Sequence, residues 1–330
     1  MAKDSFWAKK RVLVTGGAGF IGSHLVEMLV NKQAKVTVVD NLENSSLKNL
    51  HQVKSKIRFI KSDLRNFKEA KESCRGQEIV MNLAAKVGGI EYNRTHLGTM
   101  FRDNVLINTN VLEAAREAKV ERFLVVSSAC VYRRDCTIPT PEEEGFEGVP
   151  EPTNEGYGWA KRMAEVQGRL YASEFGMKIG IARPYNCYGP RDHFDPEKSH
   201  VIPALIKRIF DGENPLVVWG NGEQSRAFLY VEDFARGLIE AIEKYPVPDP
   251  INIGTDEEIK IKDLIKLILK LSGKNPQVFF DTSKPTGQPR RNCDTRKAKE
   301  KTGFEAKVKL SKGLKKTIEW YQHEKLKRKT

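Results

Sequence analysis

Residues 11–22 read Arg-Val-Leu-Val-Thr-Gly-Gly-Ala-Gly-Phe-Ile-Gly, and this stretch decides the predicted fold of the 330-residue chain. The apolar run Arg11–Thr15 predicts a buried strand, and the spacing of apolar residues over Ile21–Asn31 predicts a helix directly after it. The glycines between them let the backbone turn tightly and approach a pyrophosphate at the helix N-terminus. The stretch therefore predicts a dinucleotide-binding strand, loop and helix.

The next predicted strand, Lys35–Asp40, ends on an acidic residue. Asp40 lies at about the 20-residue distance at which such folds place the acid that binds the adenosine ribose. A carboxylate there accepts hydrogen bonds from the 2′-hydroxyl and repels a 2′-phosphate. The following residues, Asn41 and Leu42, offer no positive charge to a 2′-phosphate. The sequence thus predicts NAD as the cofactor in preference to NADP.

Strand and helix patterns alternate through the first half of the chain, which predicts an α/β fold with a doubly wound parallel (Rossmann) sheet. Further strands are expected at Ile57–Ile60, Ile79–Leu83, Phe123–Ser127 and Lys178–Ala182, and helices at Val105–Ala118 and Gly158–Phe175. After Pro184 the pattern loosens into a smaller, mixed, substrate-binding lobe. Its expected helices and strands are Pro203–Asp211, Leu216–Trp219, Phe228–Val231, Ile251–Ile253, Ile261–Leu271 and Lys312–His323.

These patterns also predict the domain limits. We expect residues 1–184 to form the NAD-binding domain, with 226–255 returning to it. Residues 185–225 and 256–330 are expected to form the substrate-binding lobe.

Composition limits the class of protein. Hydrophobic residues make up 39% and charged residues 30%, and no run approaches the roughly 20 apolar residues of a membrane span. Without a signal-peptide pattern at the N-terminus, the cytoplasm is the expected location, with no membrane partner. Five scattered cysteines lack C-x-x-C spacing, so neither a disulfide framework nor a metal site is expected.

The net charge of +13 is concentrated in the last quarter of the chain. No nucleic-acid-binding module accompanies it, so we interpret it as a solvated basic surface, with no nucleic-acid partner. Such a surface would also attract a substrate that carries a diphosphate.

Several motifs in order resemble one protein family. They are the G-x-x-G-x-x-G spacing over 16–22, Asn82-Leu83-Ala84-Ala85, Ser128, and Tyr157-Gly-Trp-Ala-Lys161. Together they resemble the extended short-chain dehydrogenase/reductases, the NAD-dependent epimerase/dehydratase family, from about Lys10 to Tyr321. The resemblance implies these cofactor contacts: Gly16, Gly19, Phe20, Ile21, Gly22, Asp40, Asn41, Asp63, Leu64, Leu83, Ala84, Ala85, Lys86, Asn104, Tyr157 and Lys161.

Tyr157 and Lys161 are four residues apart on a predicted helix, so their side chains share one face. A phenol with a pKa near 10 is a poor base at neutral pH. A neighbouring ammonium and the positive nicotinamide would lower the pKa of Tyr157. Tyr157 could then accept a hydroxyl proton while hydride passes to NAD, and Ser128 would hydrogen-bond the same oxygen.

Cys130 lies two residues beyond Ser128. The segment resembles those of GDP-mannose 3,5-epimerase and GDP-L-fucose synthase, where this cysteine is half of an acid/base pair. The stretch Tyr188-Gly-Pro-Arg-Asp192 and the later Ser199-His-Val-Ile-Pro-Ala-Leu205 resemble GDP-L-fucose synthase especially, which implies His200 as the second half; the mannose 3,5-epimerase has a lysine there. The alternatives are a buried packing thiol and a loop or helix-capping histidine.

The resemblance also places five residues on the substrate. A planar guanidinium binds two diphosphate oxygens at once, although each arginine could instead form a surface ion pair. The substrate-binding candidates are Asn186, Arg208, Trp219, Arg226 and Arg291.

The predicted function is that of a nucleotide-sugar epimerase, an isomerase that oxidises C4 transiently with bound NAD, exchanges protons at C3 or C5, and reduces C4 again. Fucose synthases end in a net reduction by NADPH, which Asp40 disfavours. The alternatives are a GDP-L-fucose synthase-like epimerase/reductase, a UDP-glucose 4-epimerase-like enzyme, and a non-enzymatic NAD- or RNA-binding scaffold. A dehydratase lacks support because Ala129 and Cys130 replace the expected Asp-Glu pair. A homodimer is predicted, since related enzymes pair the helices around Val105–Ala118 and Gly158–Phe175.

Overall fold

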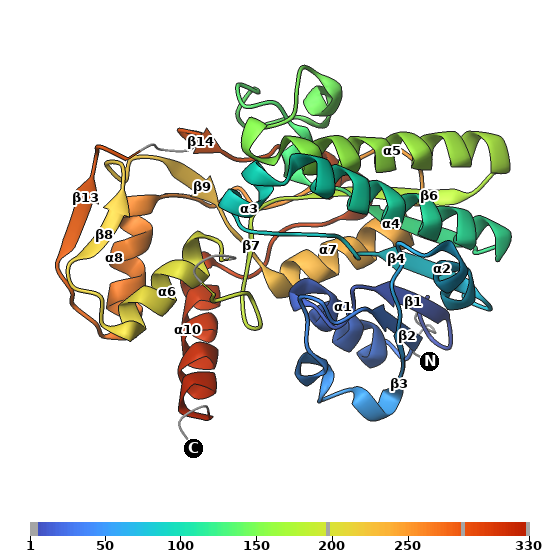
Figure 1. Cartoon of the computed structure of the whole chain (residues 1–330), viewed down its shortest axis with the longest axis horizontal. Coiled ribbons are helices and arrows are strands. Elements are labelled where there is room, and N and C mark those ends of the chain that lie inside the picture. Colours follow the sequence, from blue (N-terminus) through green and yellow to red (C-terminus); the bar gives the residue numbers. More distant parts are fainter. Residues whose placement is uncertain (1–5, 196–198, 285–287, 328–330) are drawn as a thin grey trace.

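A seven-stranded parallel sheet forms the centre of the larger part of the molecule (Figure 1). The computed structural model describes residues 6–195, 199–284 and 288–327. The strand order is β11-β6-β5-β4-β1-β2-β3, with the chain switching direction across the sheet after β3. The strands are β1 (Arg11–Thr15), β2 (Lys35–Asp40), β3 (Ile57–Lys61), β4 (Ile79–Asn82), β5 (Arg122–Val126), β6 (Lys178–Pro184) and β11 (Ile251–Ile253).

Helices cover both faces of this sheet and bury two separate apolar clusters. On one face pack α1 (Phe20–Asn31) and α7 (Val231–Lys244), with Leu25 and Leu238 fully buried. On the other face pack α2 (Phe67–Cys74), α4 (Leu97–Glu117) and α5 (Glu155–Phe175). Because both faces are covered, the inner strands are almost continuously apolar, as parallel sheets require. The predicted doubly wound α/β fold is confirmed.

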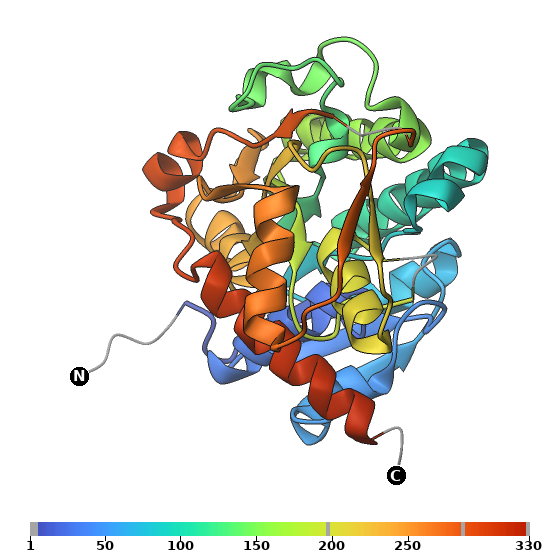
Figure 2. The same cartoon turned by 90° about the vertical axis from the view of Figure 1, so that its left-hand side faces the viewer.

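A smaller lobe lies beside the sheet, on the left of Figure 1 and facing the viewer in Figure 2. Its helices pack around a parallel strand pair, β8–β13, and a three-stranded sheet of order β12-β9-β14 lies nearby. The remaining elements are α3 (Ile90–Thr95), β7 (Cys187–Tyr188), α6 (Val201–Asp211), β8 (Leu216–Trp219), β9 (Ser225–Ala227), β10 (Leu229–Tyr230), β12 (Glu258–Lys260), α8 (Ile261–Ser272), β13 (Val278–Asp281), β14 (Arg290–Arg291), α9 (Arg296–Thr302) and α10 (Leu310–Lys327).

The structure corrects several expected boundaries. The strand expected at Phe228–Val231 ends at Tyr230, because Val231 begins α7, a helix that our prediction omitted. Glu232 and Asp233 in its first turn suit a helix N-terminus, and its buried apolar residues recur at helical spacing. The helix expected from Val105 begins eight residues earlier, at Leu97.

Two segments after Pro184 return to the sheet: β11 pairs with β6, and α7 packs against it. The exact domain limits stay a prediction. In the ranges that the structure describes, we find no helix with the length and apolar character of a membrane span.

Candidate active site

The glycine loop between β1 and α1 turns tightly and packs closely against neighbouring backbone. Gly16 has a φ of +65°, and its amide donates to the Val39 carbonyl at 2.8 Å. A side chain at Gly22 would place its Cβ 2.2 Å from the Gly16 oxygen. The N-cap residue of α1 is Gly19, which has no side chain to accept hydrogen bonds from the first amides of the helix. The helix begins with Phe20 and Ile21. Helix amides without a side-chain cap and a loop of three glycines and one alanine fit a pyrophosphate.

Asp40 lies at the carboxyl end of β2, buried beside this loop. Its carboxylate accepts hydrogen bonds from the Ala18 amide at 3.0 Å, the Leu42 amide at 2.9 Å and the Ser45 hydroxyl at 2.6 Å. Two carboxylate oxygens offer about four lone-pair positions, so one acceptor position remains for a ribose hydroxyl. Asp40 thus also fixes the glycine loop, a role that our sequence reasoning did not foresee.

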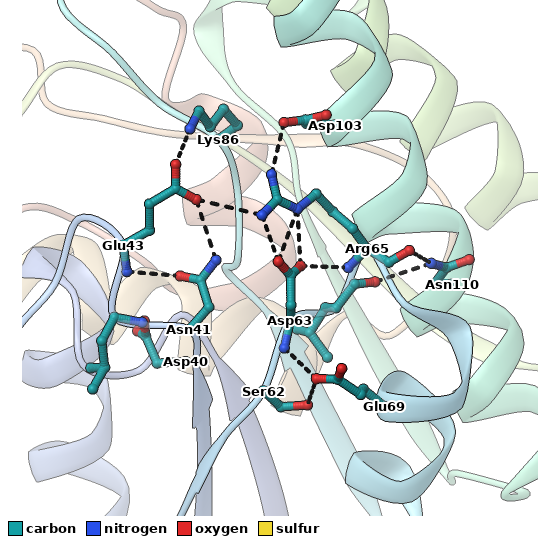
Figure 3. Close-up of polar contacts among 12 residues, drawn as sticks. Asp40, Asn41, Glu43, Ser62, Asp63, Arg65, Glu69, Lys86, Asp103 and Asn110 are labelled. Carbon is teal, nitrogen blue, oxygen red and sulfur yellow. Dashed lines mark hydrogen bonds and ion pairs between the residues drawn. The ribbon is translucent and has the colours of Figure 1, made fainter.

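Several of the expected cofactor contacts follow β3 and β4, among them Asp63 and Lys86 (Figure 3). Asp63 binds the guanidinium of Arg65, which holds the pKa of this carboxyl below its ordinary value. Leu64 is buried. The side chain of Asn104 on α4 is bonded to the backbone of Lys86. Its oxygen accepts from the Lys86 backbone amide and its nitrogen donates to the Lys86 carbonyl, both at 3.0 Å. Asn104 therefore shapes the loop after β4 that carries the expected contacts Leu83, Ala84, Ala85 and Lys86.

Ser128, Tyr157 and Lys161 come from two elements that meet at the carboxyl edge of the sheet. Ser128 follows β5, and its hydroxyl accepts from the Cys130 amide at 3.1 Å. Tyr157 and Lys161 lie in the first two turns of α5, with the ammonium 5.4 Å from the centre of the phenol ring. The ammonium donates to the Val126 carbonyl at 2.7 Å, and burial lowers its pKa to about 8.

The pKa of Tyr157 moves opposite to our expectation in the protein alone. Burial raises it, and the nearby Cys130 raises it further. The ammonium of Lys161 is 1% exposed and bonded to a carbonyl, so it does not outweigh this desolvation. An additional positive charge near the phenol would oppose this rise in its pKa.

Cys130 lies next to a positively charged group, although its chain neighbours Ala129 and Val131 belong to a buried apolar cluster. Its Sγ lies 3.9 Å from a guanidinium nitrogen of Arg291, 161 residues further along the chain. Its charge would also affect the pKa values of Tyr157 and Lys161, so all four groups lie close together. The Arg291 guanidinium therefore places a positive charge beside this sulfur.

Two candidate substrate arginines face each other. Arg226 on β9 and Arg291 on β14 are register partners in neighbouring parallel strands. Burial and then the positive charge of Arg291 lower the pKa of Arg226 to about 10. Paired guanidinium groups repel unless an anion lies between them, and a diphosphate supplies enough acceptor oxygens for both.

The other substrate candidates have different surroundings. Asn186 donates to the Ala227 carbonyl at 3.1 Å, and the Trp219 ring is 59% exposed at the end of β8. Arg208 is engaged by Glu213 and by the Val217 carbonyl, which makes it a link between α6 and β8. A substrate contact for Arg208 stays a prediction.

His200 is the N-cap residue of α6, and its side chain is exposed. Protein atoms around the ring lower its pKa, and nearby His193 lowers it further. Among the described residues we find no contact between His200 and Cys130, so the expected acid/base pair is not tested by these contacts. Its role stays a prediction.

Sequence reasoning missed a buried ionic network under the site. Glu165, one turn beyond Lys161 on α5, binds Arg183 of β6 at 2.7 Å, and both side chains are 2% exposed. The Ser127 hydroxyl, next to Ser128, donates to the same carboxylate. The spacing of four residues from Lys161 was a signal for Glu165, because it predicts a shared helix face.

Comparison with known proteins agrees with this arrangement. The model of the NAD dependent epimerase/dehydratase family matches residues 12–254, and the chain belongs to that family. It is 35% identical over 324 residues to a probable GDP-L-fucose synthase 1 of Oryza sativa subsp. japonica, covering 96% of this chain and 94% of the relative.

Solved structures are similar along nearly their whole length. The UDP-glucose 4-epimerase of Thermotoga maritima, solved with UDP-glucose, has a TM-score of 0.85 and 31% identity, covering 95% of this chain and 99% of that one. A dTDP-glucose 4,6-dehydratase of Streptomyces venezuelae, solved with NAD, has a TM-score of 0.83 and 27% identity, covering 95% and 97%. The predicted family and the NAD cofactor are confirmed.

Proposed function

We propose that this enzyme uses bound NAD to epimerise a nucleotide-diphosphate sugar. It would invert C3, C5 or both through a transient C4 ketone. The observation that carries the proposal is the cluster of Cys130 with Tyr157, Lys161 and Arg291. Tyr157 and Lys161, which would assist oxidation at C4, together with a separate thiol fit a sequence of oxidation, proton exchange and reduction.

The glycine loop and Asp40 would hold NAD, which supplies a hydride acceptor and later returns the hydride. Tyr157 accepts the C4 hydroxyl proton, with Ser128 bonded to the same oxygen. Because burial raises the pKa of Tyr157 in the protein alone, its deprotonation depends on the positive nicotinamide as well as on Lys161. Arg226 and Arg291 would bind the diphosphate and so orient the sugar.

Oxidation at C4 acidifies the protons on C3 and C5, because both carbons then adjoin a carbonyl. Cys130, 3.9 Å from the Arg291 guanidinium, would remove one of these protons as its thiolate. His200 is our candidate for returning a proton to the opposite face.

A second candidate is a GDP-L-fucose synthase-like epimerase/reductase. Similarity to the rice relative of that name favours it. Its last step would consume a reduced nucleotide, whereas the first candidate consumes none.

One experiment separates these functions. A panel of GDP-, UDP- and dTDP-sugars is incubated with the enzyme in D₂O, and deuterium is located by NMR while added NADH or NADPH is followed by absorbance. Deuterium at C3 or C5 without consumption of reduced nucleotide supports the first candidate. Stoichiometric consumption supports the second, and C4 inversion without deuterium at C3 or C5 would contradict both.

Variants assign the two steps. Tyr157→Phe should abolish all turnover, because the C4 hydroxyl then has no proton acceptor. Cys130→Ser should slow exchange at C3 and C5 by roughly 10²-fold or more, the usual contribution of a positioned acid or base, while hydride transfer at C4 survives. Cys136→Ser is the control, since its thiol contacts Thr140 and not the cluster.

A further inference from the structure

Besides Asp40 and Asp63, the carboxylate of Glu43 lies near the expected adenosine position, three residues beyond Asp40. Glu43 lies between two cations (Figure 3). One oxygen of Glu43 pairs with the ammonium of Lys86, and the other lies 3.7 Å from a guanidinium nitrogen of Arg65. Both basic side chains are thus engaged by acidic groups.

The sheet topology explains why these loops meet. Lys86 follows β4, Glu43 follows β2 and Arg65 follows β3, while β1 lies between β4 and β2. In a parallel sheet the carboxyl ends of these strands share one edge. The Glu43–Lys86 pair therefore joins segments on the two sides of the strand that leads into the glycine loop.

Other contacts fix these groups in place. The Glu43 amide donates to the side-chain oxygen of Asn41 at 3.0 Å, and the Asn41 amide donates back to the Glu43 carboxylate at 3.4 Å. Arg65 also binds Asp63 at 2.5 Å and Asp103 at 3.1 Å. These contacts fix the orientation of the Glu43 carboxylate. The guanidinium of Arg65 is already paired with two other carboxylates, so it is poorly placed to bind another anion.

We propose that Glu43 is a specificity-determining residue that excludes the 2′-phosphate of NADP. A 2′-phosphate is usually accommodated by a nearby basic side chain. Here Glu43 pairs with Lys86, contacts Arg65, and adds a negative charge three residues beyond Asp40. The inference rests on the proposed placement of the adenosine ribose at Asp40.

The test is the isosteric variant Glu43→Gln, which removes the charge and frees Lys86, while Arg65 stays bound to Asp63 and Asp103. Dissociation constants for NADH and NADPH are measured by calorimetry on the wild type and the variant. We expect NADPH to bind about tenfold more tightly to the variant, the scale of one favourable charge pair, with little change for NADH. The gain should shrink at high salt because the pair is partly exposed.

Two further variants test whether the change in affinity depends on Lys86 and on the position of the removed carboxylate. The ratio of NADPH to NADH affinity should fall back in Glu43→Gln/Lys86→Met, because the freed ammonium is gone. Glu223→Gln is the matched control, since Glu223 also pairs with two lysines, Lys260 and Lys262, but in the smaller lobe. The ratio should be unchanged there.

The outcomes distinguish a wrong placement of the adenosine from a wrong role for Glu43. If wild-type protein bound no NADH, the placement of the adenosine, and with it the proposed function, would be wrong. If NADH bound normally and Glu43→Gln left the affinity ratio unchanged, or weakened both nucleotides equally, only the role of Glu43 would be overturned.

Discussion

At the residue scale, Lys161 holds a positive charge where the fold excludes water. Its side chain is 1% exposed, and burial lowers its pKa to about 8 from the ordinary 10.5. Between these values the folded state binds fewer protons at Lys161 than the unfolded chain does. The penalty for burying the charge is therefore present below pH 8 and is relieved as the pH rises.

This gives a prediction for Lys161→Met, which cannot titrate. Relative to this variant, the wild type should gain stability between pH 8 and pH 10 by on the order of 1 kcal/mol per pH unit. Urea unfolding of both proteins at several pH values measures the difference. A constant difference over this range would show that the buried lysine keeps an ordinary pKa.

At the scale of elements, α5 joins the reactive edge of the sheet to its interior. Tyr157, Lys161 and Glu165 recur every four residues on one face, and Glu165 ends this row in the buried pair with Arg183. Removing one partner of a buried ion pair leaves the other charge uncompensated. The pair thus anchors α5 against β6 close to the two candidate catalytic residues.

We expect Glu165→Gln to lower the free energy of unfolding by about 3 to 5 kcal/mol, because Arg183 keeps its buried charge. Glu174→Gln, at an exposed position of the same helix, should change it by less than about 0.5 kcal/mol. Chemical unfolding followed by circular dichroism compares the three proteins. Equal stabilities would mean that Arg183 finds another partner.

Element by element, the sequence predicted what depends on local pattern. Strands up to β6 are short apolar runs between helices, and the glycine loop and the Tyr157–Lys161 spacing are local, so each was predictable. The helix α7 was missed because its first residues continue the strand β10 without a turn signal. The contacts of Arg291 with Cys130 and of Glu43 with Lys86 join distant segments, so only the folded topology brings them together.

At the scale of the whole molecule, α4 and α5 lie side by side on the outside of the larger part, away from the smaller lobe (Figure 1). Their inner faces pack on the sheet, yet they also expose large apolar side chains: Leu97, Phe101, Leu106, Leu170 and Phe175. Exposed apolar groups gathered on neighbouring helices are typical of a protein–protein interface. This observation is independent of the resemblance that predicted a homodimer.

We therefore expect a homodimer in solution, built on α4 and α5 of both copies. Light scattering at micromolar concentration should give twice the mass of one chain. Leu106→Glu combined with Leu170→Glu should shift the protein to a monomer, because burying four carboxylates without partners in a symmetric interface is strongly unfavourable. Phe279→Glu, at a residue 55% exposed on β13 in the smaller lobe, is the control and should stay dimeric. A monomeric wild type would contradict the prediction, whereas a dimer that survives the double substitution would place the interface on another surface.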